Sequence, residues 1–212
     1  MVRDEVRTLG VVGAGRVGLT LARLAIASGL HARVSGSGEP VRVRRPAALY
    51  APGAEAVRTE DAAAADLVAL CMPLGEYTEI DPVPFVGRIV IDAMNYWPES
   101  DGERADLDDP THPTSTLVQA HLPGARVVKA FNHVAFRDLQ ANARPSGSPH
   151  RIAIGVAGDD ANALAEVSSL VDRLGFDPVY AGTLAESRVL EPTGPVFGAV
   201  LGADALRTRL GR

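Results

Sequence analysis

The run Gly13-Ala14-Gly15-Arg16-Val17-Gly18 constrains the fold more than any other feature of the chain, because of what flanks it. The apolar stretch Leu9 to Val12 precedes it, and a segment of helical period, Leu19 to Ser28, follows it. In a strand, turn and helix of this kind, the first glycine permits a tight turn, the second lets backbone N–H groups approach a diphosphate, and the third lets the helix pack closely on its strand. A glycine-rich turn without a ligand is the alternative, but the flanks favour a dinucleotide site.

Short apolar runs rich in β-branched residues alternate with alanine-rich segments of helical period, which predicts an α/β fold of the Rossmann type. We expect a doubly wound, mostly parallel sheet with helices on both faces. The expected strands are Thr8–Val12, Ala32–Ser35, Glu55–Val57, Leu67–Cys71, Arg88–Asp92, Arg126–Ala130, Arg151–Val156 and Asp177–Ala181. The expected helices are Arg16–Ser28, Glu60–Ala64, Ser115–His121, Asp160–Leu174 and Ala203–Leu210, and the expected loops are Pro98–Pro113 and Asn142–Pro149.

Composition excludes several classes of function. The net charge of -5 and the absence of a basic stripe argue against a nucleic-acid partner. No apolar run is long enough to span a bilayer and the first residues lack a secretory core, so we expect a cytoplasmic protein. Cys71 is the single cysteine, which excludes an internal disulfide and a multi-cysteine metal site. Because Cys71 lies in an apolar run, we expect a buried, unreactive thiol.

The end of the second strand indicates which nucleotide is bound. An acidic residue about twenty positions after the glycines binds the ribose hydroxyls of NAD, but Val34-Ser35-Gly36-Ser37-Gly38 contains none. Small residues with hydroxyl and N–H groups can instead surround a 2′-phosphate, so NADP is favoured. Arg42, Arg44 and Arg45 could supply positive charge, or could be only a solvated cluster. Glu39 opposes NADP if its carboxylate faces the same pocket.

Three later strand ends carry residues suited to a flat heteroaromatic ligand, because ligands bind beyond the carboxyl ends of strands in such sheets. These segments are Met72-Pro73-Leu74, Asn95-Tyr96-Trp97 and Lys129-Ala130-Phe131-Asn132-His133. The first can flank a nicotinamide ribose, while the aromatic residues and amides of the others can stack and hydrogen-bond a ring. Loop capping by the amides, a core position for Trp97 and a surface histidine are the alternatives.

At this point the chain resembles a family, the NADPH-dependent reductases of the deazaflavin coenzyme F-420 and the dinucleotide-binding proteins named after them. The resemblance spans most of the chain and rests on Gly13 to Gly18, Gly36-Ser37, Asp92-Ala93-Met94-Asn95, Leu122 to Asn132, Ala157 to Asp160 and Leu190-Glu191-Pro192. It implies that Gly36 and Ser37 lie near the 2′-phosphate, that Pro73, Asn95 and Ala130 lie near the nicotinamide, and that a deazaflavin stacks on its exposed face. The chain departs from the family at Gly38, where the founding reductases have an arginine.

The expected activity is hydride transfer between NADP(H) and a deazaflavin (coenzyme F-420) or flavin-like acceptor, which requires mainly that two rings are held in contact. The expected cofactor-binding residues are Gly13, Ala14, Gly15, Arg16, Val17, Gly18, Ser35, Gly36, Ser37, Met72, Pro73, Leu74, Asn95 and Ala130. The expected catalytic residues are Asn95, Asn132 and His133, with His133 as an optional proton donor; the expected acceptor-binding residues are Tyr96, Trp97, His133 and Glu191. No metal site is expected.

Alternatives remain open at this point. A small carbonyl, imine or quinone could replace the flavin-like acceptor, or the protein could be a redox sensor that binds NADP without turnover. Short-chain dehydrogenase chemistry is excluded, because Ala125 stands where the Tyr-x-x-x-Lys pattern needs a tyrosine before Lys129, the sole lysine. Lys129 could form a salt bridge or touch a ligand, and Glu191 could close over the acceptor or be a surface acid.

We expect residues 1–145 to form the dinucleotide-binding region and residues 146–212 to complete the same compact unit. Prolines and glycines interrupt the sequence after Gly182, which predicts a small C-terminal lobe folded over the strand ends and covering the acceptor site. The expected partners are a small-molecule acceptor and a second copy in a homodimer.

Overall fold

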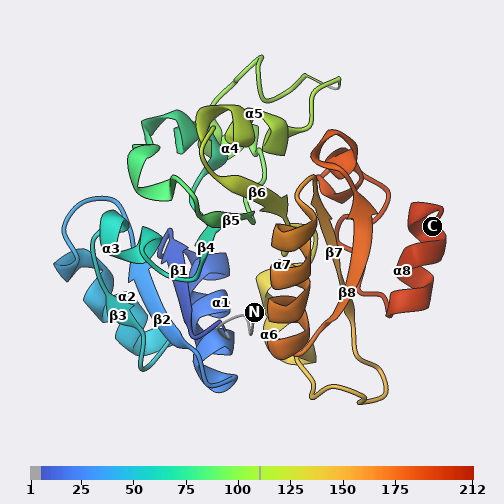
Figure 1. Cartoon of the computed structure of the whole chain (residues 1–212), viewed down its shortest axis with the longest axis horizontal. Helices are drawn as coiled ribbons and strands as arrows, with labels where there is room; N and C mark the ends of the chain where they lie inside the picture. Colours follow the sequence, from blue (N-terminus) through green and yellow to red (C-terminus); the bar gives the residue numbers. More distant parts are fainter. Residues whose placement is uncertain (1–5, 110) are drawn as a thin grey trace.

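One twisted sheet of eight strands organises the protein, as the computed structural model shows for residues 6–109 and 111–212 (Figure 1). The strands are β1 Thr8–Val12, β2 His31–Ser35, β3 Glu55–Ala56, β4 Leu67–Leu70, β5 Ile89–Asp92, β6 Arg126–Lys129, β7 Ala153–Gly158 and β8 Asp177–Gly182. Their order is β3-β2-β1-β4-β5-β6-β7-β8. The paired strands are parallel except that β7 is antiparallel to β6. The predicted Rossmann-type, mostly parallel sheet is therefore confirmed.

Helices cover both faces of the sheet. The α-helices are α1 Arg16–Ala27, α2 Val41–Tyr50, α3 Thr59–Ala63, α4 Pro98–Asp101, α5 Thr114–His121, α6 Phe136–Asn142, α7 Ala161–Arg173 and α8 Ala203–Leu210. Three 3-10 helices are η1 Leu74–Glu79, η2 Val83–Phe85 and η3 Leu184–Leu190. In the described part of the chain no helix is long and apolar enough to cross a membrane.

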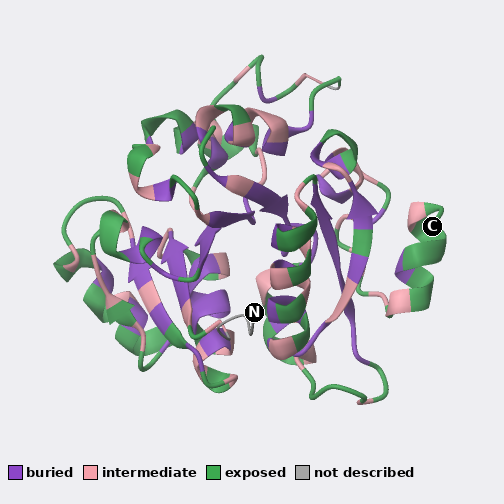
Figure 2. Ribbon diagram, viewed as in Figure 1, coloured by how far each residue is buried: buried purple, intermediate pink, exposed green. Residues whose placement is uncertain are grey.

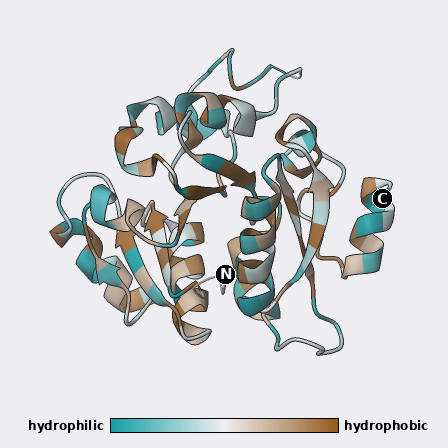
Figure 3. Cartoon of the chain, viewed as in Figure 1, coloured by the Kyte–Doolittle hydropathy of each residue, from teal (hydrophilic) through white to brown (hydrophobic). Residues whose placement is uncertain are grey.

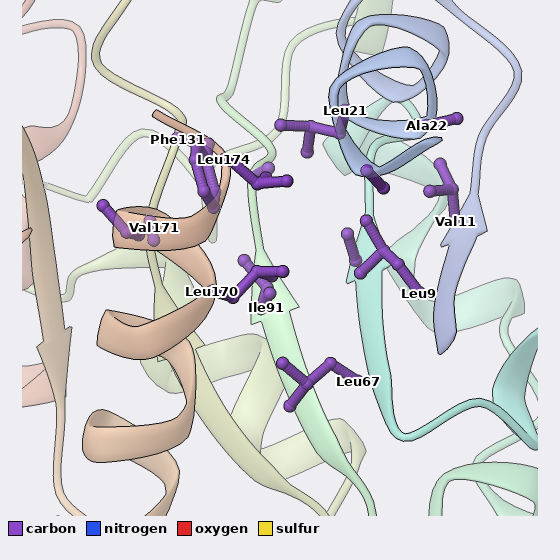
Figure 4. Packing of buried hydrophobic residues seen from close by; sticks show 14 of the residues in the cluster. Leu9, Val11, Leu21, Ala22, Leu67, Ile91, Phe131, Leu170, Val171 and Leu174 are labelled. Carbon is purple, nitrogen blue, oxygen red and sulfur yellow. The ribbon is translucent and has the colours of Figure 1, made fainter. Parts of the chain in front are cut away.

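The side chains of the central strands alternate between the two faces of the sheet, and the hydrophobic core is therefore divided into one cluster on each face. Leu9, Val11 and Ile91 belong to a cluster on one face, with α1 and α7, whereas Val12 and Val90 belong to a cluster on the other. Successive strand residues point to opposite faces, so strands that are covered on both sides read as continuous apolar runs. Figure 4 shows the first cluster between strands and helix α7, and Figure 2 shows buried residues concentrated in the sheet. The strands of the sheet are also mostly hydrophobic (Figure 3).

The C-terminal segment adds a third cluster at the outer end of the sheet. Val179 and Ala181 of β8 pack with Leu190, Val196 and Leu206, and so connect β8 to η3 and α8. After Gly182 the described chain forms η3 and α8 and no further strand. The segment thus lies against β7 and β8 and against α5, which brings it close to the carboxyl end of β6.

All eight predicted strands are present, but the sequence missed three of the α-helices, α2, α4 and α6. Helix α2 buries only Val43 and Ala47 and contains Pro46, so it lacks the apolar stripe that identifies a helix. Helix α6 is only seven residues long. The predicted loop Pro98–Pro113 begins with the short helix α4, which is a correction to that interpretation.

Candidate functional site

The glycine turn between β1 and α1 contains glycines of two kinds. Gly13 has φ +115°, and a Cβ there would lie 2.5 Å from the Cys71 carbonyl oxygen. A Cβ on Gly18 would overlap the Gly13 carbonyl. For a Cβ on Gly15, the Cys71 oxygen at 4.0 Å is the one near neighbour in the described chain. Packing therefore requires Gly13 and Gly18, whereas Gly15 leaves an open cradle beside the backbone.

The N-terminus of α1 is available to an anion. Gly15 is its N-cap, no side chain caps the helix, and its first turn contains no acid. Helix α7 differs, because the Asp160 carboxylate accepts a hydrogen bond from the Ala163 N–H at 2.7 Å. The partial positive charge and free N–H groups of an uncapped helix favour an anion, so the open cradle at Gly15 fits a diphosphate.

A cavity of about 300 Å³ adjoins the glycine turn at the carboxyl ends of β1, β2 and β4. It is lined by Val12, Gly13, Gly36, Ser37, Gly38, Thr59, Glu60, Met72, Glu76, Glu79, Ile80, Asp81 and Pro84. The structure thus brings together predicted residues from three separate segments. We call it the nucleotide cavity, since its position beyond the strand ends is where dinucleotides bind in such sheets.

Several predicted cofactor residues do not line this cavity. Leu74 and Ala130 are buried in the two hydrophobic clusters, so only their backbone can face a ligand. The Ser35 carbonyl accepts a hydrogen bond from the Gly13 N–H at 2.9 Å, which ties β2 to the turn. Arg16 lines a second cavity, of about 370 Å³, and its guanidinium lies 5.5 Å from the centre of the Phe136 ring. That second cavity lies between α1, α2 and α6 and also includes Ala14 and Gly15.

A fully buried ion pair joins the ends of β5 and β6. Lys129 Nζ lies 3.1 Å from Asp92 Oδ2 and donates a hydrogen bond of 2.7 Å to the Met94 carbonyl. The same Asp92 oxygen accepts a bond of 2.6 Å from Ser115 Oγ, while Oδ1 accepts one from the Met94 N–H. Lys129 therefore forms the salt bridge that the sequence left open, and it fixes the backbone immediately before Asn95.

Asn95 and Asn132 bind each other at this edge. Asn95 Nδ2 donates to the Asn132 carbonyl at 2.8 Å, and Asn132 Nδ2 donates to Asn95 Oδ1 at 3.0 Å and to the Leu190 carbonyl at 2.6 Å. Asn132 Oδ1 is buried and has no hydrogen-bond partner among the described residues. A buried acceptor without a partner costs free energy, and because this oxygen is closed off from solvent, a ligand would reach it only if the surrounding side chains moved.

The backbone just before Asn132 is strained. Phe131 has φ +64°, a conformation that is rare for a bulky residue, and its ring is 1% exposed and packs against Phe176. Such strain of about 1–3 kcal/mol persists where the surrounding structure holds it, often at binding sites. Here it lets the chain leave β6 so that Asn132 meets both Asn95 and the C-terminal segment.

A cavity of about 260 Å³ collects the predicted acceptor residues Tyr96, Trp97 and Glu191. We call it the acceptor cavity; its other lining residues are Pro98, Glu99, Leu107, Asp108, Thr114, Arg188, Pro192 and Thr193. Trp97 is 44% exposed and lies edge-on to Phe197. The Tyr96 hydroxyl donates to the Gly102 carbonyl at 2.9 Å and accepts from the Arg104 N–H, so it is fixed as a wall.

Glu191 is a buried structural acid as well as a lining residue. Its Oε1 accepts hydrogen bonds from the Thr114 N–H at 2.7 Å and from Thr114 Oγ1 at 2.9 Å, and its Oε2 lies 3.6 Å from Arg188 Nη1. The carboxylate thus ties η3 to the start of α5. The surface-acid alternative is wrong, because Glu191 is only 4% exposed.

His133 lies in the core beneath the site. The ring is 1% exposed, and Nε2 accepts a hydrogen bond of 2.9 Å from the Gly155 N–H. Burial lowers the pKa of His133 to about 4, while the backbone of Val196 acts in the opposite direction. A neutral ring whose Nε2 already accepts a bond serves the packing of β7 in this geometry.

The buried His133 predicts a pH dependence of stability. Because its native pKa of about 4 is below the ordinary 6.5, the unfolded chain binds the proton more tightly, and stability falls as the pH drops below 6.5. The contribution to the free energy of unfolding is fully present above pH 6.5 and decreases by about 2 kcal/mol at pH 5. Denaturant unfolding at the two pH values should show this loss in wild type and in His31→Gln, an exposed control, but not in His133→Gln. An equal loss in His133→Gln contradicts the assignment.

The Cys71 thiol is held in its protonated form. Burial, and secondarily the Asp92 carboxylate, raises the pKa of the Cys71 thiol well above its usual range, so it stays protonated at neutral pH. No cluster of three His, Cys, Asp or Glu side chains that could hold a metal ion occurs among residues 6–109 and 111–212.

Sequence reasoning missed several lining residues. In the nucleotide cavity these include Thr59 and Glu60, which follow the two-residue strand β3, and the acids of η1. In the acceptor cavity they include Thr114 and Arg188. The position of Thr59 just after a strand was a usable signal, whereas Arg188 reaches the cavity only through the packing of η3.

Comparison with known proteins agrees with this arrangement. Residues 8–96 match the family described as NADP oxidoreductase, coenzyme F420-dependent. The structure of hypothetical protein SMa0349 from Sinorhizobium meliloti superposes with a TM-score of 0.78 at 28% identity, over 94% of this chain and 97% of that one. A candidate F420-dependent NADP-reductase from Arthrobacter sp. FB24 gives a TM-score of 0.68 at 25% identity, over 86% and 87% of the two chains.

Among curated proteins, metalloreductase STEAP3 of Rattus norvegicus is 27% identical over 193 residues, which are 90% of this chain and 37% of the rat protein. The chain spans about two fifths of the length of the curated relatives it matches. The family match covers the glycine turn, the end of β2 and the segment through Tyr96, which are the parts that build the nucleotide cavity. Through residues 8–96 the chain is similar to the family described as NADP oxidoreductase, coenzyme F420-dependent.

Proposed function

We propose that this protein transfers a hydride between NADP(H) and a deazaflavin or flavin-like acceptor held against Tyr96 and Trp97. The observation that carries the proposal is the cradle at Gly15, which the protein's own packing leaves open beside the uncapped N-terminus of α1. Both features suit a diphosphate. The match of residues 8–96 to a family of NADP-dependent oxidoreductases supports the same cofactor.

The residues divide the work between two ends of one ligand. The turn from Gly13 to Gly18 would hold the diphosphate, and Gly36 and Ser37 would lie beside the adenosine end in the nucleotide cavity. Asn95 and Asn132, which are hydrogen-bonded to each other at the carboxyl ends of β5 and β6, would lie beside the nicotinamide. When bound, NADPH supplies the hydride.

The protein's part in the chemistry is positioning. Hydride transfer between rings needs reacting carbons about 3–3.5 Å apart and no acid–base pair in the protein. His133 is neutral and buried, and the Tyr96 hydroxyl already makes two hydrogen bonds. Both fit a site that positions rings without donating or accepting a proton. Exclusion of water by the aromatic wall would protect the transfer.

A second candidate acceptor is a small carbonyl, imine or quinone. The acceptor cavity, at about 260 Å³, lies near the lower end of the usual size of ligand pockets, about 300–1,000 Å³. Glu99, Asp108 and Glu191 line it, and Arg188 is its single basic lining residue. An acidic small cavity favours a compact acceptor without anionic groups.

The cytoplasmic location, the homodimer and the division into residues 1–145 and 146–212 stay predictions.

Turnover tests the proposal directly. We expect steady oxidation of NADPH when coenzyme F-420, FMN or a quinone is added. The loss of NADPH absorbance measures the rate of this oxidation. The acceptor that supports the fastest turnover distinguishes the flavin-like from the small-substrate candidate. Binding of NADPH without turnover on any acceptor would indicate the redox sensor instead.

Trp97→Leu tests the acceptor wall. Loss of the indole should raise the KM for the acceptor about tenfold, because an aromatic contact contributes stacking as well as buried area. The dissociation constant of NADPH should change less than about twofold, since Trp97 does not line the nucleotide cavity. Tyr180→Leu, which removes a 49% exposed aromatic ring from β8, is the matched control and should change neither constant. An unchanged KM in Trp97→Leu contradicts the acceptor role.

A further inference from the structure

Trp97 and helix α4, which together form one wall of the acceptor cavity, have little packing of their own. Helix α4 is four residues long and none of its residues is buried. Trp97 is 44% exposed, and its ring centre lies 5.7 Å from that of Phe197. Because a segment with few buried apolar groups is weakly fixed by packing, polar contacts must hold this wall in place.

Both carboxylate oxygens of Asp101, the last residue of α4, hold the wall. Oδ2 accepts a hydrogen bond of 2.7 Å from the Trp97 N–H, and Oδ1 accepts one of 3.0 Å from the Gly75 N–H. In the sequence Gly75 lies between Met72 and Glu76, which both line the nucleotide cavity, whereas Trp97 lines the acceptor cavity. One side chain therefore connects the walls of the two cavities.

Arg104 makes a second connection between the same segments. Its Nη1 donates to the Gly75 carbonyl at 2.8 Å, and its backbone N–H donates to the Tyr96 hydroxyl at 2.9 Å. Asp106 orients the guanidinium by accepting hydrogen bonds from Nε at 2.9 Å and from Nη2 at 2.8 Å. A Cβ on Gly75 would lie 3.0 Å from Asp101 Cβ, so the loop packs directly on the start of η1. Both polar groups of the Gly75 backbone are therefore bound by this loop.

We propose that Asp101 is a positioning residue that couples the two cavities, so that a nucleotide bound beside the segment around Gly75 sets the position of Trp97 for the acceptor. This inference rests on the proposed function and adds an order of binding, the nucleotide first and the acceptor second. A bound nucleotide restrains the segment from Met72 to Glu76, and the two hydrogen bonds of Asp101 transmit that restraint to α4. Because such coupling is reciprocal, the acceptor should raise the nucleotide affinity by the same factor.

The emission of Trp97, the only tryptophan in the chain, reports the position of this wall. Titration of wild type with NADP⁺, whose oxidised nicotinamide does not absorb the indole emission, should change that emission as the nucleotide site fills. In Asp101→Asn an NH₂ group replaces one acceptor oxygen, so one of the two links is lost. We expect the emission change to fall below about a quarter of the wild-type value, while calorimetry gives an NADP⁺ dissociation constant within about threefold of wild type.

Turnover with FMN as the acceptor gives a second readout. Asp101→Asn should raise the KM for FMN about tenfold, the equivalent of one hydrogen bond to a charged group, and change kcat less than about threefold. Glu103→Gln is the matched control, because it makes the same acid-to-amide change at an exposed position of the same loop. It should keep the wild-type emission change and the wild-type KM within about twofold.

The outcomes separate this inference from the proposed function. If calorimetry shows that NADP⁺ binds but the emission of Trp97 stays unchanged, or if Asp101→Asn keeps the wild-type emission change, the coupling is wrong while the nucleotide site stands. Loss of NADP⁺ binding in Asp101→Asn also contradicts the coupling, since Asp101 would then support the nucleotide cavity itself. If wild type binds no NADP⁺, the proposed function fails together with this inference.

Discussion

Gly15→Ala is expected to weaken NADPH binding about 100-fold or more while leaving the free energy of unfolding within about 1 kcal/mol of wild type. Gly15 has φ -81° and ψ -172°, a conformation that alanine adopts without strain, and the nearest atom to an added Cβ is 4.0 Å away. A methyl group there makes at most one van der Waals contact, with the Cys71 carbonyl oxygen, and no clash. It would instead occupy the cradle that we assign to the diphosphate and hold the ligand away from the N–H groups of α1.

Gly13→Ala is the matched opposite. At φ +115°, with a Cβ 2.5 Å from the Cys71 carbonyl, alanine should lower the free energy of unfolding by about 3 kcal/mol or more. Both variants are single methyl additions within one turn, so their contrast separates packing from ligand binding. Denaturant unfolding and NADPH titration on the two proteins measure it. Tight NADPH binding by Gly15→Ala would mean that the diphosphate does not lie on this turn.

The strands could be predicted because the sheet is covered on both faces. Strands β1, β4 and β5 are buried throughout apart from Thr8, and Asp92 is the one charged residue in them, so each reads mainly as an apolar run. Helix α2 could not be predicted in this way, because tertiary packing of Val43 and Ala47 alone, and not a periodic stripe, holds it. Its identification came only with the structure.

The same distinction between local sequence pattern and tertiary packing applies to the candidate site. Residues that directly follow strands, such as Asn95 and Trp97, could be chosen from the sequence because the carboxyl ends of parallel strands share one edge. The hydrogen-bond partners of other site residues could not be predicted, because the two members of each pair are far apart along the chain. Thr114 and Glu191 are 77 residues apart, and Gly155 and His133 are 22 apart. Nothing local in the sequence identified His133 as buried or Glu191 as bonded.

Lys129→Met is expected to lower the free energy of unfolding by about 3–5 kcal/mol, the cost of leaving one partner of a buried ion pair uncompensated. Neither Lys129 nor Asp92 is exposed at all, and the lysine also satisfies the Met94 carbonyl. Exposed pairs behave differently even at shorter distance. Arg207 and Asp204 lie 2.7 Å apart with side chains 49% and 100% exposed, so Arg207→Met should cost less than about 1 kcal/mol.

A second substitution, at Asp92, tests whether the uncompensated charge causes the loss of stability in Lys129→Met. In Lys129→Met/Asp92→Asn no buried charge remains, and an asparagine oxygen can still accept the hydrogen bond from the Met94 N–H that Asp92 Oδ1 accepts. We therefore expect the double variant to recover about 2 kcal/mol of the loss, and the double-mutant cycle from denaturant unfolding gives the coupling. If the double variant is as unstable as Lys129→Met, the lysine acts through its packing and its bond to Met94 alone. Recovery instead shows that an ion pair holds the segment that presents Asn95, so the geometry of the nicotinamide end depends on one buried lysine.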